Sequence, residues 1–297
     1  MELADRCIQA KAFDQTKAGV KGLADSGITE IPAMFHAPLS ALTSLKPPPS
    51  QLTIPTVDLN GGSLCSKKQD MRRRSVVEKI GEASEKWGFF QVINHGIQLE
   101  VLERMLQGIR AFHEQDSEAK KRFYTRDFSS DTYYASNFDL YTSQGASWRD
   151  TVGCYTAPDP PRLEDLPATY GDVLNRPNVV PVFQRSPMSC MANEGHNRGA
   201  AQVLNVLGVF DPSKLITNDK FISAEHRVVA NGSTEPRISA PCFFSTFMKA
   251  NPHVYGPIKE LLSEENPAKY RELTINEFAD IFRSKTISTP ALHHFRI

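Results

Sequence analysis

The stretch from Leu215 to Thr246 constrains the fold most, because it contains two strand-like runs joined by a turn. The runs, 221–230 and 238–247, flank a turn-rich insert from Asn231 to Pro236, which is a hairpin signal. Residues two apart in a strand point to the same side of a sheet. We therefore expect Arg237 and Ser239 to share one face of this hairpin.

The same hairpin carries one histidine, His226, and this combination suggests a chemistry. An imidazole can bind a metal ion, and a guanidinium beside a hydroxyl can hold a carboxylic acid that bridges to that metal. The three residues are therefore candidates for a metal and carboxylate site, provided that the rest of the chain supplies further ligands.

Charge and composition exclude several classes of protein. Lys plus Arg equals Asp plus Glu at 34 each, so no net field favours nucleic acid or an anionic membrane. The basic run 72–74 reads as a solvated helix face rather than a phosphate site. The start of the chain lacks the pattern of a signal peptide, and no apolar run reaches the roughly 18 residues of a membrane helix. A soluble, cytoplasmic protein is the expectation.

The cysteines agree with a reducing compartment. They are odd in number, scattered and without C-x-x-C spacing, which favours reduced thiols over a disulfide framework or a zinc site. They are Cys7, Cys65, Cys154, Cys190 and Cys242.

Hydrophobic periodicity and turn signals predict the remaining elements. His95 lies in a turn without a partner at metal spacing, so we expect it to cap that turn rather than bind metal. Met71 and Phe282 are expected on the buried sides of their helices, as is Ile8 beside Phe13. The expected helices span 4–25, 67–87, 99–114 and 275–284, with a helical turn from the Asp116 cap to Phe123 and further helices that begin at Leu166 and at Tyr255. The expected strands are 54–59, the centre of 87–97, and the antiparallel pair 133–138 and 148–155. Pro32, Pro38 and 47–49 mark an extended arm.

Several segments together resemble one family. They include 54–59, 87–96, Phe112-His113-Glu114-Gln115, 123–127, Ser147-Trp148-Arg149-Asp150 and 215–239. The chain resembles the plant 2-oxoglutarate- and iron(II)-dependent dioxygenases, most closely the 1-aminocyclopropane-1-carboxylate oxidase homologues and deacetoxyvindoline 4-hydroxylase-like enzymes. The resemblance covers residues 5–173 and 215–297.

The resemblance implies a mixed α+β fold, with a double-stranded β-helix (jelly-roll-like) core and flanking helices. It implies an oxidoreductase in which a His-x-Asp pair and a distant His hold Fe(II), 2-oxoglutarate and O2 take the open positions, and ascorbate assists. A small plant metabolite is then oxidised with release of succinate and CO2. By motif, His226 matches the distant iron ligand, and Arg237 and Ser239 match the pair that grips the far carboxylate of 2-oxoglutarate.

The chain departs from that pattern at the metal. None of its eight histidines is followed two residues later by Asp or Glu. Residues 174–214 read as an unrelated bridging segment, without sustained alternation and with at most one short helix near 200–207. Glu194 and His196 have the reverse order, in a segment expected to be a loop, so their spacing reads as accidental. The expected organisation is a helical and Pro-rich leader (1–50), an N-terminal dioxygenase region (51–173), the bridging segment, and a C-terminal dioxygenase part (215–297), truncated by loss of central strands.

Two functions remain open. The first is a member of the oxygenase family whose activity is impaired, because two of three iron ligands are absent. The second is a non-catalytic truncated isoform or pseudoenzyme that acts as a binding or interaction protein. The abrupt junction at Leu215 suggests a lost exon or a mis-spliced gene model.

Overall fold

The computed structural model describes residues 3–36, 53–60, 67–138, 140–141, 145–156, 160–174, 188–198, 206–208, 211–224, 236–244, 253–284 and 290–297. These residues form two compact units, each assembled from three separate stretches of chain. Unit 1 comprises Met1–Lys46, Gln98–Gln202 and Val229–Ala250, and unit 2 comprises Pro47–Ile97, Val203–Val228 and Asn251–Ile297.

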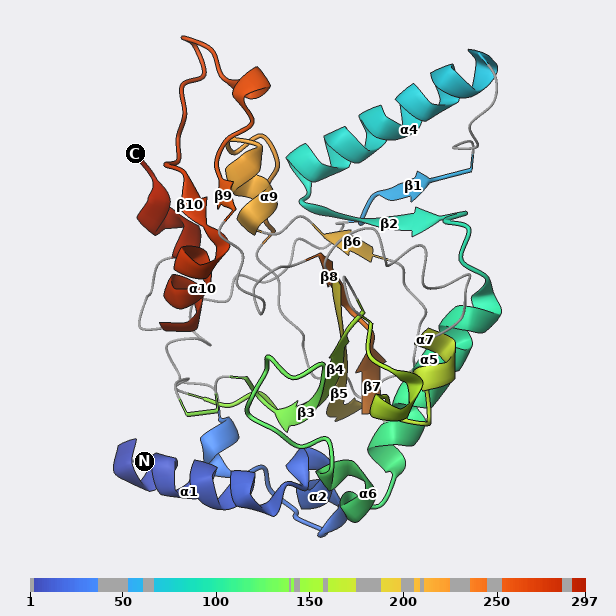
Figure 1. Ribbon diagram of the computed structural model, residues 1–297, viewed down its shortest axis with the longest axis vertical. Coiled ribbons are helices and arrows are strands. Elements are labelled where there is room, and N and C mark those ends of the chain that lie inside the picture. Colours follow the sequence, from blue (N-terminus) through green and yellow to red (C-terminus); the bar gives the residue numbers. More distant parts are fainter. Residues whose placement is uncertain are drawn as a thin grey trace. The chain divides into compact units, whose positions relative to one another are not determined.

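An antiparallel sheet forms the centre of unit 1 (Figure 1). Its order is β3 (Thr132–Ser136), β4 (Arg149–Tyr155), β5 (Met188–Arg198) and β7 (Pro236–Ser239), and β8 (Cys242–Phe244) pairs further along β5. The expected pairing of 133–138 with 148–155 is confirmed, since β3 and β4 are antiparallel.

The segment 174–214 contains two strands, although its sequence shows no sustained alternation. It contributes β5 to this sheet, β6 (Val206–Gly208) to unit 2, and the start of helix α9 (Asp211–Ile216). The helix expected near 200–207 is wrong at 206–207, where the chain is a strand. The Asn, Gly, Glu and Ala residues of β5 have weak strand propensity, but pairing with β4 on one side and β7 on the other supplies backbone hydrogen bonds to the strand.

Helix α5 (Leu99–Glu114) packs its apolar stripe into the main core of unit 1. Ile109 and Phe112 are fully buried there with Tyr134 and Ile238 of the sheet. A Cβ at Gly108 would lie 2.5 Å from the carbonyl oxygen of Thr169, so only glycine allows the segment before α7 (Gly171–Leu174) to approach this closely. Helix α6 (Ser117–Lys121) follows, and the predicted cap is confirmed because the Asp116 side chain accepts from the Glu118 N–H at 2.8 Å.

The amino-terminal helix expected at 4–25 is two helices, α1 (Leu3–Thr16) and α2 (Gly19–Asp25). The chain breaks at Lys17 and Gly19, which have φ of 55° and 71°. The region after Pro32 is packed against the protein, whereas the sequence predicted an extended arm there. The 3₁₀ turn η1 (Ala33–Phe35) buries Phe35, whose ring lies edge-on to Trp148 with the ring centroids 4.8 Å apart. Ile8 is 68% exposed, so the buried side predicted for this region is wrong at that residue. A second 3₁₀ turn, η2, spans Leu163–Asp165.

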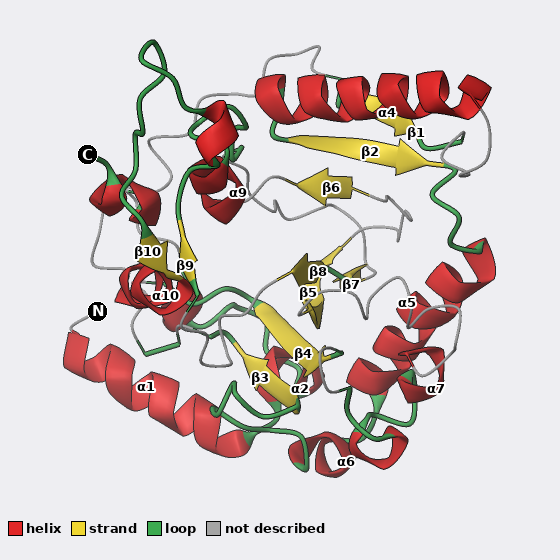
Figure 2. Cartoon of the chain, turned by 45° about the horizontal axis from the view of Figure 1, so that its top comes forward, coloured by secondary structure: helices red, strands yellow, loops and turns green. Residues whose placement is uncertain are grey.

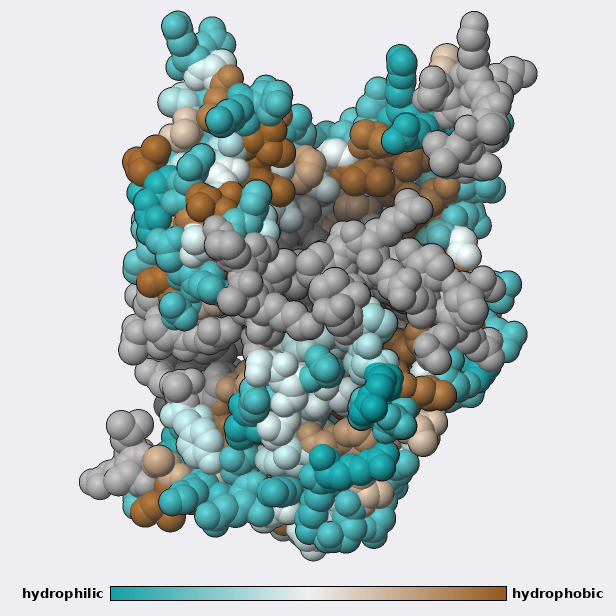
Figure 3. Space-filling model, viewed as in Figure 1, coloured by the Kyte–Doolittle hydropathy of each residue, from teal (hydrophilic) through white to brown (hydrophobic). Residues whose placement is uncertain are grey.

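Unit 2 contains a small mixed sheet covered by one long helix. Strand β1 (Thr56–Asp58) runs parallel to β2 (Phe89–Ile93), which pairs antiparallel with β6. Helix α4 (Lys67–Lys86) lies along β1 and β2 (Figure 2) and contributes Ala83 to their apolar cluster. Hydrophobic surface is visible beside α4 (Figure 3), and Met71, which was predicted to be buried, is 72% exposed.

The turn after β2 agrees with the sequence. Asn94 and Gly96 adopt φ of 54° and 81°, and the Ile97 N–H donates to His95 Nδ1 at 3.1 Å. The prediction that His95 caps the turn is therefore confirmed.

The carboxyl-terminal part of unit 2 combines β9 (Val254–Tyr255), η3 (Lys259–Leu261), β10 (Leu273–Thr274), α10 (Ile275–Ser284) and η4 (Ala291–Phe295). The helix expected from Tyr255 is wrong, because the chain there is a strand followed by a 3₁₀ turn. The Thr274 cap is confirmed: its hydroxyl accepts from the Glu277 N–H at 3.2 Å, and the Glu277 carboxylate accepts from the Thr274 N–H at 2.7 Å. Phe282, predicted to be buried, is 55% exposed.

Candidate functional site

Strand β7 carries Arg237 and Ser239 on one face of the unit 1 sheet. Ile238 between them is buried in the core beside α5, whereas Arg237 is exposed and Ser239 is half-buried. The prediction that the two residues share a face is confirmed. The preceding strand of the expected hairpin is not formed at 221–224, and its remaining residues, including His226, lie outside the described residues. The second expected strand is divided into β7 and β8 at Ala240-Pro241.

The strand register extends this face across the sheet. Arg149 of β4 pairs with Gly195 of β5, which pairs with Arg237 of β7. Directly opposite residues in antiparallel strands lie on the same face. One row of the sheet therefore has arginine positions on both sides of a glycine, with backbones about 10 Å apart across two strand spacings.

The chemistry of this row suits a small carboxylate. A guanidinium presents a planar fork that donates two parallel hydrogen bonds to a carboxylate. The Ser239 hydroxyl lies two residues from Arg237, or about 7 Å along the strand, and adds a further donor. Such an anion site needs no metal ion.

The described residues do not by themselves fit a three-donor iron site. Within them, no group of three His, Cys, Asp or Glu side chains comes together to hold a metal ion. Glu194 and His196 lie in β5 rather than in the expected loop, and the register shifts between Gly195 and Arg198.

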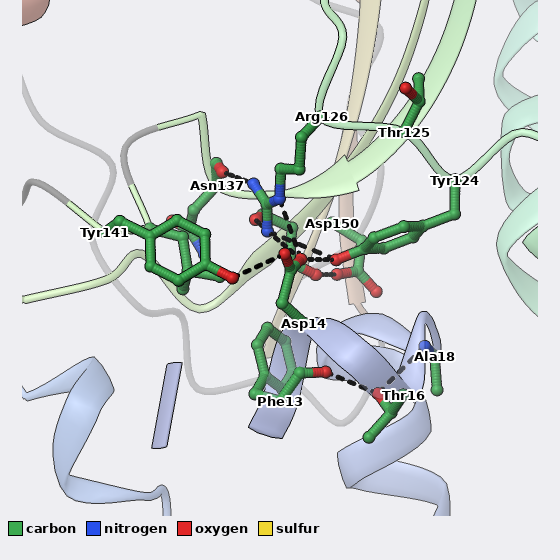
Figure 4. A network of polar contacts seen from close by, with 12 residues as sticks. Phe13, Asp14, Thr16, Ala18, Tyr124, Thr125, Arg126, Asn137, Tyr141 and Asp150 are labelled. Carbon is green, nitrogen blue, oxygen red and sulfur yellow. Dashed lines mark hydrogen bonds and ion pairs between the residues drawn. The ribbon is translucent and has the colours of Figure 1, made fainter. Parts of the chain in front are cut away.

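A polar cluster that the sequence did not reveal fastens α1 to the sheet (Figure 4). The Asp14 carboxylate accepts from Arg126 Nε at 2.9 Å and Nη2 at 2.5 Å, and from the hydroxyls of Tyr124 and Tyr141. Burial alone would raise the pKa of Asp14, but these hydrogen bonds outweigh it and hold that pKa below its usual value. Burial and the bond to Asp14 raise the pKa of Tyr141 to about 12.

Asp150 performs a similar role for α2. It is fully buried and accepts from the N–H groups of Val20 at 2.8 Å and Lys21 at 3.0 Å, and from the hydroxyls of Tyr134 and Ser136. The sequence signal was a carboxylate within the expected strand 148–155, near its start, where burial is costly unless the carboxylate is hydrogen-bonded. Both acidic clusters are fully engaged in holding the amino-terminal helices, so neither is a candidate catalytic site.

Comparisons with known proteins give the family. The family model described as non-haem dioxygenase in morphine synthesis N-terminal matches residues 54–182. The 1-aminocyclopropane-1-carboxylate oxidase homolog 5 of Arabidopsis thaliana is 52% identical over 365 residues, covering 100% of this chain and 91% of the relative. The chain belongs to the plant 2-oxoglutarate- and iron(II)-dependent dioxygenase family. The family's cofactors are Fe(II) and 2-oxoglutarate.

Solved structures agree on the fold of this dioxygenase. JOX2 in complex with 2OG, Fe and JA has a TM-score of 0.71 at 19% identity, covering 94% of this chain and 97% of that one. The dioxygenase for auxin oxidation in rice has a TM-score of 0.65 at 16% identity, covering 82% and 100%. The predicted mixed α+β fold with a jelly-roll-like core is confirmed.

The alignments also show that this dioxygenase lacks residues its relatives have. The alignment with homolog 5 spans 365 positions and includes all 297 residues here, so 68 positions of the relative have no counterpart. Homolog 4 of Arabidopsis thaliana, at 50% identity, aligns over 363 positions and 100% of both chains. None of the helices in the described part of the chain combines the length and the apolar character that a membrane-spanning helix requires.

Proposed function

We propose that this dioxygenase-family chain binds 2-oxoglutarate through Arg237 and Ser239 but is impaired in turning it over. The observation that carries the binding half is the geometry of β7, where Arg237 and Ser239 lie together on the face opposite the buried Ile238. Arg237 binds the far carboxylate of 2-oxoglutarate, and Ser239 donates a further hydrogen bond to it. Arg149, in the same row, adds positive charge to that face.

The proposal that turnover is impaired rests on how many iron ligands the chain supplies. The family's iron site takes two histidines and one carboxylate, leaving positions for cosubstrate and O2. His226 is proposed as the distant histidine, but the chain contains no His-x-Asp or His-x-Glu to complete the set. We place the relatives' unmatched positions between Asp172 and Leu215, where the bridging segment 174–214 divides the family's regions 51–173 and 215–297. One imidazole does not retain Fe(II) against water.

An active oxygenase of a small plant metabolite is the second candidate. It is favoured by the 52% identity to homolog 5 across the whole of this chain. It requires the bridging segment to supply two iron ligands. Such ligands would have to come from a segment whose only His is His196.

Binding and turnover are measured separately. Isothermal titration of 2-oxoglutarate into the full chain, with a chelator present, should show binding that Arg237→Ala weakens at least about ten-fold, because charged hydrogen bonds contribute roughly 1.5–3 kcal/mol. Arg73→Ala, an exposed arginine on α4, is the matched control and should bind normally. Binding that is absent, or equal in wild type and Arg237→Ala, contradicts the assigned site.

Turnover is followed as succinate released with Fe(II) and ascorbate. Wild type and His226→Ala should give the same background rate. Succinate well above the His226→Ala rate would establish the active oxygenase instead. Sequencing the transcript across the codons for Asp172 to Leu215 tests the lost-exon hypothesis directly.

A further inference from the structure

Helix α4 carries a run of three arginines that the proposed 2-oxoglutarate site does not use. Arg72, Arg73 and Arg74 are all exposed, and so is Ser75, which follows them. Among the described residues, no carboxylate forms an ion pair with any of the three arginines. The prediction that this run is a solvated helix face is therefore confirmed, and its guanidinium groups are accessible to a partner.

The order of these residues is the one that arginine-directed protein kinases select. Such a kinase binds its substrate segment in an extended form, and carboxylates in its groove pair with guanidinium groups two and three residues before the accepting serine. An apolar pocket takes the residue after the serine. Arg73 and Arg72 hold the two positions before Ser75, and Val76 follows it. No other serine or threonine of the chain has arginines at both positions.

The turn of α4 around Ser75 has little to hold it closed. Residues 71–75 are all exposed, and among the described side chains of α4 those that reach the apolar cluster of β1 and β2 begin at Val76 (Figure 2). Ser75, Val76 and Val77 are also three successive residues of modest helix propensity. Backbone hydrogen bonds therefore carry most of the stability of this turn, and its opening gives up the partly buried contact of Val76.

We propose that Ser75 is a phosphorylation site for a serine/threonine kinase with an acidic substrate groove. In the transfer the Ser75 oxygen attacks the terminal phosphorus of ATP, the bond from that phosphorus to the bridging oxygen breaks, and ADP leaves. The serine proton passes to the carboxylate base of the kinase, and no atom is oxidised or reduced. The site is independent of 2-oxoglutarate binding, because Arg237 and Ser239 belong to unit 1 and Ser75 to unit 2.

The helix supplies partners for the phosphate when the turn closes again. Side chains three and four residues apart are neighbours on a helix. Arg72 precedes Ser75 by three residues and Lys79 follows it by four, so two cations flank the phosphate, and Glu78 is the one like charge at this spacing. A phosphoserine carries roughly 1.5–2 negative charges at neutral pH. Modification therefore offsets more than half of the positive charge of 72–74 on this face of unit 2.

A kinase assay on the full chain tests the proposal. The folded protein is incubated with ATP and the catalytic subunit of cyclic-AMP-dependent protein kinase, whose groove selects arginines at these two positions, and is then digested with a protease that cleaves after lysine. Fragment 69–79 has Ser75 as its sole hydroxyl side chain, so a mass gain of one phosphoryl group on it locates the modification. We expect this gain in the wild type and not in Ser75→Ala.

Matched arginine variants separate recognition from exposure alone. Arg72→Ala and Arg73→Ala should each lower the initial rate at least about ten-fold, because each removes a charged pair with the kinase, whereas Arg74→Ala should keep the wild-type rate. All three change exposed side chains, and circular dichroism should show the wild-type fold.

The synthetic peptide 69–79 tests whether the turn opens in the folded chain. Peptide and folded chain should both be phosphorylated. Phosphate on the peptide but not on the folded chain would overturn the proposal, because α4 would then keep Ser75 out of the groove. Absence of phosphate from both, or equal rates in Arg72→Ala and Arg74→Ala, would overturn it as well.

Discussion

Removal of the Asp150 carboxylate should detach helix α2 from the sheet. Asp150 is fully buried and accepts four hydrogen bonds, two of them from the first N–H groups of α2. In Asp150→Ala the amides of Val20 and Lys21 and the Tyr134 hydroxyl lose their charged acceptor. A hydrogen bond to a charged group contributes about 1.5–3 kcal/mol, and a lost helix cap costs about 1 kcal/mol.

These contributions are not additive, because water enters the space left by the carboxylate and satisfies some of the donors. We therefore expect Asp150→Ala to lower the free energy of unfolding by about 4 kcal/mol, and Asp150→Asn by about 2 kcal/mol since one acceptor oxygen remains. A domain's whole stability is roughly 5–15 kcal/mol, so the Ala variant should be visibly destabilised.

Urea unfolding followed by circular dichroism gives the global effect, and amide hydrogen exchange at Val20 and Lys21 gives the local one. Asp165→Ala is the control: Asp165 is paired with Arg162 on the surface at 2.9 Å, and its loss should change stability by less than about 0.5 kcal/mol. The reasoning is refuted if Asp150→Ala loses less than about 1 kcal/mol and both amides keep wild-type protection.

Two further predictions follow from the polar contacts. The pKa of Asp14 in the folded chain lies below its unfolded value, so the contribution of Asp14 to stability is present above about pH 4 and is lost as the pH falls through the folded-state pKa. Limited proteolysis of α1 should therefore accelerate in that pH range in the wild type and be pH-independent in Asp14→Asn. Thr274→Ala removes the α10 cap and should cost about 1 kcal/mol in urea unfolding, whereas Thr274→Ser should be neutral.

Elements whose signals are local were predicted well from the sequence. Helices α5 and α10 have the bounds expected from their apolar spacing. The caps were visible as single residues, Asp116 before α6 and Thr274 before α10. These features depend on neighbours within a few residues, so the sequence alone contains the information. His95 belongs with them, since its partner is only two residues away.

Elements determined by distant partners were not predicted. The break between α1 and α2 is stabilised by a carboxylate about 130 positions along the chain, and β5 is a strand because β4 and β7 pair with it. Helical periodicity predicts which side of a helix faces the core, but not whether a neighbouring element covers that side along its whole length. Ile8, Met71 and Phe282 lie at apolar positions of their helices and are nevertheless exposed. In the candidate site, the shared face of Arg237 and Ser239 could be predicted because side chains alternate between the two faces of a strand. The row of Arg149, Gly195 and Arg237 could not be predicted, because it depends on the register in which β4, β5 and β7 pair.

The interleaving of the two units has a consequence for how the chain can be made. Each unit draws on the beginning, the middle and the end of the sequence. During synthesis the last strands and helix of unit 2 leave the ribosome only when translation is nearly complete, so early stretches must wait with apolar surface uncovered. Long-range pairing of this kind slows folding. A shortened product that stops before β7 would leave both units unfinished at once, and it would be a substrate for chaperones and proteases rather than a smaller working protein.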